Sequence, residues 1–482
     1  MTTSSPKAVV GVDVGGTFTD LFWFDEAAKR FRTAKVPSQR GDEAKGFIAG
    51  LTTFGPVSEL ASIVHGTTVG TNALLERKGA RVGIITTPGF RDALEMRRRD
   101  RRQTWGLWGD FVPVASRDCR VEVPERTLAD GTIHVAVDRE AVREAARALH
   151  GKGCEALAII FINAYANPQN ERDALEAARA VWPNENIACS SAILPEIREF
   201  ERSSTTALNA TLQPVVGSYL GRLEQALAAD GFKGRFHIVQ SNGGVMSTAT
   251  ARRLPVRTAL SGPAAGVIAA AAIARAAGHP DIITGDLGGT SFDVSLIAGG
   301  QAALAAQTTI DFGMVIRTPM IEITTIGAGI DGEKPLGTLQ RLDVEAARAA
   351  IAREIAEPLG LDVMAAAEAI VKIANARMAG AIRLVSIERG HDPAKFMAMP
   401  FGGGGALHAG ALIHEVGLKG ALVPRFPGVT SALGCVIADI RHDGVQTVNL
   451  MLEGLDAAAL DARMVEAGRE AHRIVAEAGL PG

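Results

Sequence analysis

The sequence is short of cysteine and of net charge, and it has no long apolar run; each shortage excludes a class of protein. Its four cysteines show no CxxC spacing, which argues against a disulfide framework and a cysteine zinc site and favours a reducing compartment. A net charge of −3 gives no general reason to expect nucleic acid or an anionic membrane as partner. The longest apolar run, from Ala264, is broken by Arg275 and is too short to span a membrane.

The chain also lacks a P-loop and a leader-like start. No GxxxxGK sequence followed by Ser or Thr occurs, which excludes that class of ATPase. The first residues, MTTSSPKAVVGVD, contain no apolar segment before a cleavage site, so we expect a cytoplasmic protein. With 482 residues, of which 47% are apolar, the chain is long enough for two to four domains with real cores.

One decapeptide pattern occurs twice. GVDVGGTFTD begins at Gly11 and GDLGGTSFDV begins at Gly285. The matched positions keep one constant separation, and these pairs are Asp13 with Asp286, Gly15 with Gly288, Gly16 with Gly289, Thr17 with Thr290, and Asp20 with Asp293. Each copy reads as a strand, a glycine turn and a second strand, so we expect two hairpins of the same kind.

A Gly-Gly-Thr hairpin turn suits a phosphate, because glycines let backbone N–H groups converge on an anion and the threonine hydroxyl adds a donor. The aspartate two residues earlier ends a strand, where it can hold hydrated Mg²⁺ or orient water. We therefore predict that Asp13 and Asp286 are catalytic residues that hold Mg²⁺ through water. The predicted phosphate ligands are Gly15, Gly16, Thr17, Gly288, Gly289 and Thr290.

The rest of the chain predicts an α/β fold, because strands such as RVGIITT alternate with helical stretches. Helices are expected in DREAVREAARALHGKG, in STTALNATLQPVVGSYLGRLEQALAADG with an interruption or a bend near Pro214, and in the last residues. We place the main boundary near residue 200, between domains 1–200 and 201–482. A third glycine-rich stretch, FGGGGALHAG from Phe401, follows a strand, and Gly403, Gly404 and Ala406 would let a base and ribose lie against the backbone.

Together these motifs resemble the actin, sugar-kinase and heat-shock ATPase superfamily. Within it, the chain resembles the hydantoinase A/5-oxoprolinase family through GVDVGGTFTDL, HGTTVGTNALLERKGARVGIITTPGFRD, PEIREFERSSTTALNA, QSNGG, SGPAAGV, DLGGTSFDV and FGGGGALHA. The resemblance spans residues 9 to about 445. It implies two actin-like, ribonuclease H-like ATPase domains with a nucleotide cleft between them, and ATP with Mg²⁺ as cofactors.

The same resemblance implies a function. The chain would be the ATP-binding subunit of an amidohydrolase that phosphorylates a cyclic amide, such as a hydantoin, a lactam or 5-oxoproline, for ring-opening hydrolysis. A hydantoinase B-type subunit is the expected partner, and nucleic acid and membrane are not expected. Two alternatives stay open: an ATP-dependent carboxylase subunit of the acetone carboxylase type, and a nucleotide-binding assembly subunit without turnover.

Several weaker signals also give predictions. HGTTVGTN contains His65, Thr67 and Thr68, and SNGG contains Ser241 and Asn242; each set is either a substrate loop or a structural turn. Ser261 before Gly-Pro is expected to cap a helix. The basic run RRRDRR at 97–102 is expected to be a solvated face. After Gly329 the chain lacks several tens of residues that relatives carry, which puts substrate binding in question.

Overall fold

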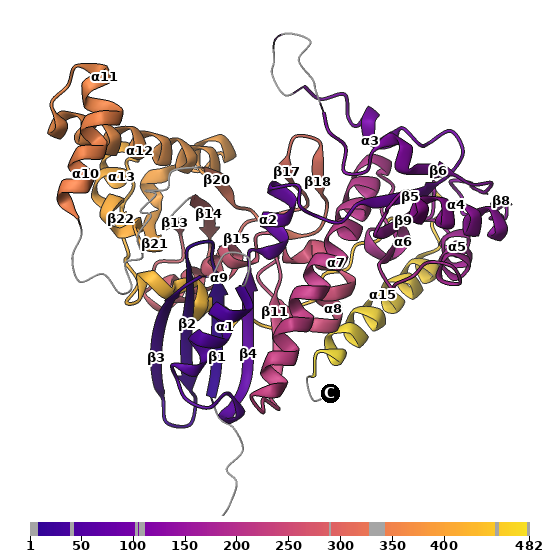
Figure 1. The fold of residues 1–482 in the computed structure, drawn as a ribbon, viewed down its shortest axis with the longest axis horizontal. Coiled ribbons are helices and arrows are strands. Elements are labelled where there is room, and N and C mark those ends of the chain that lie inside the picture. Colours follow the sequence, from indigo (N-terminus) through magenta and orange to yellow (C-terminus); the bar gives the residue numbers. More distant parts are fainter. Residues whose placement is uncertain are drawn as a thin grey trace, which may run out of the picture.

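The computed structural model describes residues 8–38, 43–101, 105, 111–288, 291–326, 343–448 and 453–479. Strands and helices alternate along these ranges, so the expected α/β class is confirmed. Figure 1 shows three groups of elements, with the β1–β4 strands below, the β5 and β9 group on one side, and the β13 and β14 group with α12 and α13 on the other. The segment after Gly329 that differs from relatives, and the hairpin residues Gly289 and Thr290, lie outside the described residues.

The first sheet contains the first of the two repeated hairpins. Its strand order is β12-β11-β4-β1-β2-β3, in which β1 pairs antiparallel with β2 and parallel with β4. The strands are β1 (Ala8–Val14), β2 (Phe18–Asp25), β3 (Arg30–Pro37), β4 (Leu60–Thr67), β11 (Arg235–Val239) and β12 (Val245–Ser247). Val10, Val12 and Val14 alternate along β1 and are fully buried, so Asp13 points to the opposite face of the sheet.

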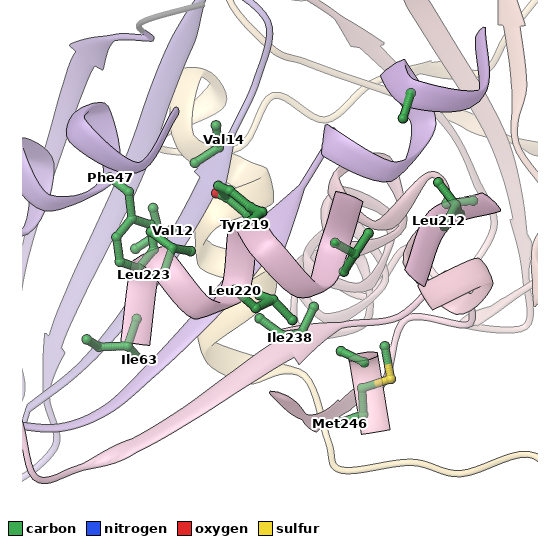
Figure 2. Packing of buried hydrophobic residues seen from close by; sticks show 14 of the residues in the cluster. Val12, Val14, Phe47, Ile63, Leu212, Tyr219, Leu220, Leu223, Ile238 and Met246 are labelled. Carbon is green, nitrogen blue, oxygen red and sulfur yellow. The ribbon is translucent and has the colours of Figure 1, made fainter. Parts of the chain in front are cut away.

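The valine face of this sheet is covered by α1 (Glu43–Thr52) and by the long helix α7 (Glu199–Ala229). Figure 2 shows Tyr219, Leu220 and Leu223 of α7 packed among sheet residues that include Val12 and Ile63. Each fully buried leucine here contributes about 1.5–3 kcal/mol by leaving water. The expected helix is confirmed, and it runs through Pro214 without ending there.

The second sheet lies beside the first half of α7. Its strands are all parallel in the order β10-β9-β5-β6, and it packs on α7 through Ala207 and Ala210. The elements of this group are β5 (Val82–Thr86), β6 (Arg120–Glu122), β7 (Arg126–Thr127), β8 (Ile133–Val135), β9 (Ala156–Ile160), β10 (Ile187–Cys189), α3 (Ala93–Met96), α4 (Arg139–Gly151), α5 (Gln169–Arg179) and α6 (Ser190–Ile193). Asp138 caps α4 by accepting two backbone N–H bonds, as its place before the helical pattern predicts.

The third sheet repeats the first around the second hairpin. β13 pairs antiparallel with β14 and parallel with β21, as β1 does with β2 and β4. Its elements are β13 (Ile282–Leu287), β14 (Phe292–Ala298), β15 (Gln301–Ala302), β20 (Thr324–Ile326), β21 (Met397–Phe401), β22 (Gly420–Ala421), α10 (Val344–Ile351), α11 (Glu357–Leu359), α12 (Val363–Val385) and α13 (Ala409–Val416). The repeated decapeptides therefore occupy equivalent places in two similar sheets.

The remaining elements connect these sheets. They are α2 (Val69–Leu75), α8 (Thr248–Arg253), α9 (Ser261–Ala276), α14 (Thr430–Ile437), α15 (Ala457–Glu477), β16 (Leu304–Ala305), β17 (Thr308–Asp311), β18 (Met314–Ile316) and β19 (Met320–Ile321). The first sheet draws strands from both sides of residue 200, because β11 and β12 follow it. The division into 1–200 and 201–482 stays a prediction. Among the described helices, none is both long and apolar enough to cross a bilayer.

Helices α9 and α14 lie between the first and third sheets and pack closely. Ala265 of α9 contacts the first-sheet core, whereas Val267 and Ala270 contact the third. Gly434 of α14 lies so near α9 that a Cβ there would be 1.9 Å from the carbonyl oxygen of Ala265. Only glycine fits this crossing without a shift of backbone.

Gly434→Ala is expected to lower the free energy of unfolding by about 1–3 kcal/mol, the usual cost of overpacking. The control is Gly380→Ala on α12, where an added Cβ meets nothing within 4 Å and helix propensity favours alanine. Denaturant unfolding of both variants checks the prediction. Equal stability of the two would show that α9 and α14 are not tightly packed.

Candidate functional site

The first hairpin presents two aspartates on one face. Asp13 of β1 and Asp20 of β2 are directly opposite in the antiparallel register, so their side chains are neighbours. The Asp13 carboxylate lies in a gap left by two glycines, since a Cβ on Gly66 or Gly262 would come within 3.0 or 2.8 Å of its Oδ1. That Oδ1 is buried without a hydrogen-bond partner. Burial first, and then the charge of Asp20, raise the pKa of Asp13 to about 7.

The second hairpin has the same arrangement. Asp286 of β13 is opposite Asp293 of β14. The Asp286 carboxylate lies against Gly402, where a Cβ would be 2.4 Å from its Oδ1, and the Ser431 hydroxyl is 3.5 Å from its Oδ2. Burial raises the pKa of Asp286 well above its usual value, and the charge of Asp293 raises it further.

Helix α14 brings the two hairpins together. Ser431 contacts Asp286, and Cys435 lies beside Asp13, whose charge helps to raise the pKa of the already buried thiol. Residues four apart on a helix are neighbours, with Cβ atoms roughly 5–6 Å apart. Asp13 and Asp20 also contribute to the raised pKa of Asp286. The four aspartates therefore form one cluster, here called the carboxylate cluster (Asp13, Asp20, Asp286 and Asp293).

A lysine that sequence reasoning missed lies at this cluster. Lys35 of β3 binds Asp20 with Nζ 2.7 Å from Oδ1, and it also donates to the carbonyl oxygen of Gly428 at 3.3 Å. Its charge acts to lower the pKa of Asp13, Asp20 and Asp286. The available signal was weak, because Lys35 lies outside the repeat and its approach to Asp20 depends on the β2–β3 register. Asp20 and Asp293 were visible as matched positions of the repeat.

The turn residues of the first hairpin form a small open loop. The N–H of Gly15 is bonded to the carbonyl of Phe18, and the N–H of Gly288 makes the same kind of bond to Ser291 in the second hairpin. In the part of the chain that is described, the N–H groups of Gly16 and Thr17 have no such partner. These two donors remain available to an anion, as the phosphate interpretation requires.

The third glycine-rich stretch follows β21 and borders the second hairpin. The N–H of Gly404 donates to the carbonyl of Leu287, and a Cβ on Gly403 would meet nothing within 4 Å. Ala406 is exposed. The structure thus places Gly403, Gly404 and Ala406 beside the end of the strand that carries Asp286, and their role in holding adenosine stays a prediction.

The carboxylate cluster fits Mg²⁺. An unpartnered buried oxygen on Asp13 and a second buried carboxylate on Asp286 are hard oxygen donors, which Mg²⁺ prefers while it keeps several waters. Within the described residues, no group of three or more His, Cys, Asp or Glu side chains is arranged as a protein-only metal site. A hydrated ion held by two aspartates and a ligand's phosphates agrees with both observations.

His65, Thr67 and Thr68 are placed differently from one another. His65 is fully buried, pairs with the Tyr219 hydroxyl at 2.9 Å, and points away from Asp13, since it is in register with Val12. This placement supports a core residue rather than a substrate ligand. Thr67 is also buried, whereas the hydroxyl of the half-buried Thr68 bonds the carbonyl of Val14.

The buried His65 gives a test of the fold by pH. Burial lowers its pKa to about 4, so the unfolded chain binds a proton that the folded chain does not between about pH 6.5 and 4. Stability from this group is present at neutral pH and is lost as the pH falls through that window. The stability advantage of the wild type over His65→Gln should shrink by about 3 kcal/mol from pH 7 to pH 4. Parallel unfolding profiles would contradict this placement; exposed His134→Gln is the control.

Ser241, Asn242 and Ser261 make internal hydrogen bonds. The Ser241 hydroxyl donates to the carbonyls of Arg257 and Ala259, and the Asn242 amide donates to Asp443 at 2.8 Å. A substrate role for Ser241 and Asn242 stays a prediction. The expected cap at Ser261 is wrong: α9 begins at Ser261 itself, whose hydroxyl instead bonds the backbone of Thr67.

Comparison with known proteins shows which family the chain matches. The model of the hydantoinase/oxoprolinase N-terminal region matches residues 9–182, and the hydantoinase/oxoprolinase model matches residues 202–332 and 330–444. An uncharacterized protein of Methanocaldococcus jannaschii is 32% identical, with 95% of this chain and 76% of that protein covered.

Two further relatives are subunits of named enzymes, and solved structures of enzymes with the same names are similar to this chain. Caprolactamase subunit alpha of Pseudomonas jessenii is 31% identical over 92% of this chain and 72% of its own length. The structure of ATP-dependent caprolactamase superposes with a TM-score of 0.84 at 29% identity, covering 98% of this chain and 77% of that one. The acetone carboxylase beta subunit of Xanthobacter autotrophicus is 27% identical over 93% of this chain and 72% of its own. A nucleotide-free acetone carboxylase structure gives a TM-score of 0.81 at 26% identity, covering 98% and 77%.

The repeated aspartate hairpins, the two family models and the similarity over nearly the whole chain agree. The chain belongs to the hydantoinase/oxoprolinase family.

Proposed function

We propose that this protein is the ATP-binding subunit of an ATP-dependent amidohydrolase that activates a cyclic amide for ring-opening hydrolysis. The observation that carries the proposal is the carboxylate cluster, in which two repeated hairpins meet at α14. Four acidic side chains with one adjacent lysine would repel a bare triphosphate. They suit a triphosphate whose charge is shared with Mg²⁺, with Asp13 and Asp286 as the residues that hold the ion through water.

Phosphoryl transfer depends on positioning and charge neutralisation, and different residues around the cluster would contribute to each. The free N–H groups of Gly16 and Thr17 would hold phosphate oxygens. Lys35 would add positive charge from the side of Asp20. Bound Mg²⁺ supplies further charge neutralisation on the phosphates.

Phosphorylation would overcome the low reactivity of the amide. An unstrained lactam or hydantoin amide is a weak electrophile with a poor leaving group. Attack of its carbonyl oxygen on the γ-phosphorus breaks the bond to the β–γ bridging oxygen, releases ADP and leaves the phosphoryl group on the amide oxygen. Water then adds to the activated carbon, the ring C–N bond breaks, and inorganic phosphate leaves. The caprolactamase relative supports this class of substrate.

A partner subunit belongs to the proposal. Relatives of the chain are named as alpha or beta subunits, which supports a multi-subunit enzyme. We propose a hydantoinase B-type subunit as the partner and the site of hydrolysis. The four cysteines are free and buried thiols, which supports the proposed cytoplasmic location.

A second candidate is the ATP-dependent carboxylase subunit. The acetone carboxylase beta subunit covers as much of the chain as caprolactamase does, and a chain of an acetone carboxylase structure superposes nearly as well as caprolactamase. In this case the phosphoryl acceptor would be a carbonyl of a ketone or of bicarbonate. The carboxylate cluster would serve the same purpose.

An ATPase assay with the co-purified partner separates these candidates. The proposal predicts that lactams, hydantoins or 5-oxoproline stimulate ADP release and yield the ring-opened acid without bicarbonate. Stimulation that requires both a ketone and bicarbonate would establish the carboxylase instead. ATP binding without turnover on any substrate of the panel would favour an assembly subunit.

A further inference from the structure

A pocket lies between the end of α3 and the start of α7, outside the carboxylate cluster. Its volume is about 490 Å³, within the roughly 300–1,000 Å³ of small-molecule sites. Figure 1 shows α3 with the second-sheet group, away from β13 and β14. The walls combine positive charge with apolar surface, through Arg97, Arg98, Arg198, Met96, Ile197 and Phe200.

Residues 98–101 of the basic run are exposed, as the solvated-face prediction expects, but Arg97, which forms one wall of the pocket, is not. The Arg97 side chain is only 9% exposed, and its guanidinium lies over the rings of Phe111 and Phe312, at 4.6 and 4.3 Å from their centroids. Its Nε is buried without a hydrogen-bond partner. The backbone of Arg97 has φ 48°, a strained value for a non-glycine residue that persists only where surrounding contacts enforce it.

The remaining charges at the pocket leave it positive. Arg98 binds Glu201 through two bonds of 2.9 and 2.7 Å, and the Glu199 carboxylate pairs with the buried Arg202. Both acids of the first turn of α7 are thus engaged. Within the described ranges, Arg97 pairs only with Asp100, at 3.0 Å, and Arg198 has no ion-pair partner.

The start of α7 adds to this positive charge. Arg198 is the N-cap of a 31-residue helix, and no side chain caps it. The first N–H groups of a helix lack partners within the helix, and the helix dipole places partial positive charge there. Beside them, Met96 and Ile197 are 58% and 51% exposed, which is apolar surface that a ligand would cover.

We propose that this pocket is a binding site for a small aliphatic carboxylate. The carboxylate would pair with Arg198 and the free N–H groups of α7, and the aliphatic chain would lie on Met96, Ile197 and Phe200. A phosphate ion would bind the positive groups but leave the apolar wall exposed. The same positive groups would repel an aliphatic amine.

The ligand class connects with the reaction, because ring opening of a lactam releases a carboxylate on an aliphatic chain. That link rests on the proposed function, whereas the site itself does not. Carboxylate binding to the pocket is measured without ATP. The binding site and the proposed amidohydrolase function can therefore be disproved independently.

Isothermal titration of the full chain with hexanoate tests the site, with hexylamine and inorganic phosphate as comparison ligands. Hexanoate is expected to bind saturably, more tightly than phosphate, and hexylamine is expected not to bind. Arg198→Gln should raise the dissociation constant for hexanoate by about tenfold or more, since it removes one charge-assisted contact. Arg143→Gln, at a partly exposed arginine on α4, is the matched control and should leave binding unchanged.

Ile197→Asp provides a second variant, which places a negative charge on the exposed apolar rim and should abolish hexanoate binding. Circular dichroism confirms that each variant folds. The proposal is overturned if hexanoate does not bind, if it binds equally well to Arg198→Gln and Ile197→Asp, or if ATP displaces it competitively. Phosphate binding with hexanoate excluded would show a simple anion site instead.

Discussion

Asp286→Asn is expected to lower kcat/KM for ATP by at least about 100-fold, the scale on which one preorganised electrostatic contact acts in a transition state. Asparagine keeps the shape of the side chain but removes a charge from the carboxylate cluster. Asp13→Asn should have a similar effect, and the double variant should lose little more, because the two residues would serve one metal ion. Steady-state ADP release with the stimulating substrate measures the effect.

The same variants should fold normally. Burial raises the pKa of both Asp13 and Asp286, so the folded chain already disfavours their charged forms. A neutral amide at either position is therefore expected to leave the free energy of unfolding unchanged or to raise it at neutral pH. Asp25→Asn at the far end of β2 is the activity control. Full turnover by both Asp13→Asn and Asp286→Asn would show that neither aspartate is needed for catalysis.

Lys35→Met is expected to lower kcat/KM for ATP roughly 10- to 100-fold, which corresponds to the 1.5–3 kcal/mol of a hydrogen bond to a charged group. Methionine keeps much of the length of the side chain, so the loss reports on the ammonium group. Lys35→Arg should recover part of the activity. Titration calorimetry of Mg·ATP binding provides a readout that does not depend on turnover.

The control for Lys35 is Arg30→Met, at the other, exposed end of β3. That variant should bind Mg·ATP as the wild type does. If Lys35→Met also bound Mg·ATP normally and turned over at the wild-type rate, the contact with Asp20 would be only a surface ion pair, which contributes little to stability.

The repeat in the sequence predicted more of the site than any single motif. Because Asp13 and Asp286 occupy matched places, two similar hairpins could be expected, and both form with the same strand pairing. What the sequence could not show is which distant segments meet there. Ser431 and Cys435 of α14 link the hairpins, and neither residue belongs to a recognisable motif.

His65 and Arg97 are both polar residues whose surroundings the local sequence does not show, and the physical reason differs between them. His65 comes one residue before the glycine that faces Asp13, and strand alternation therefore turns its ring into the core. Arg97 lies in a charged run, yet Phe111 and the distant Phe312 lie against its guanidinium. Local pattern does not reveal which face a strand buries or which distant ring lies over a charge.

A structure determined with Mg²⁺ and a non-hydrolysable ATP analogue tests the central claim most directly. The metal should lie between Asp13 and Asp286, with the phosphates on Gly16 and Thr17 and the base beside Gly403. A nucleotide that contacts only one hairpin, or that binds elsewhere on the molecule, would contradict the account.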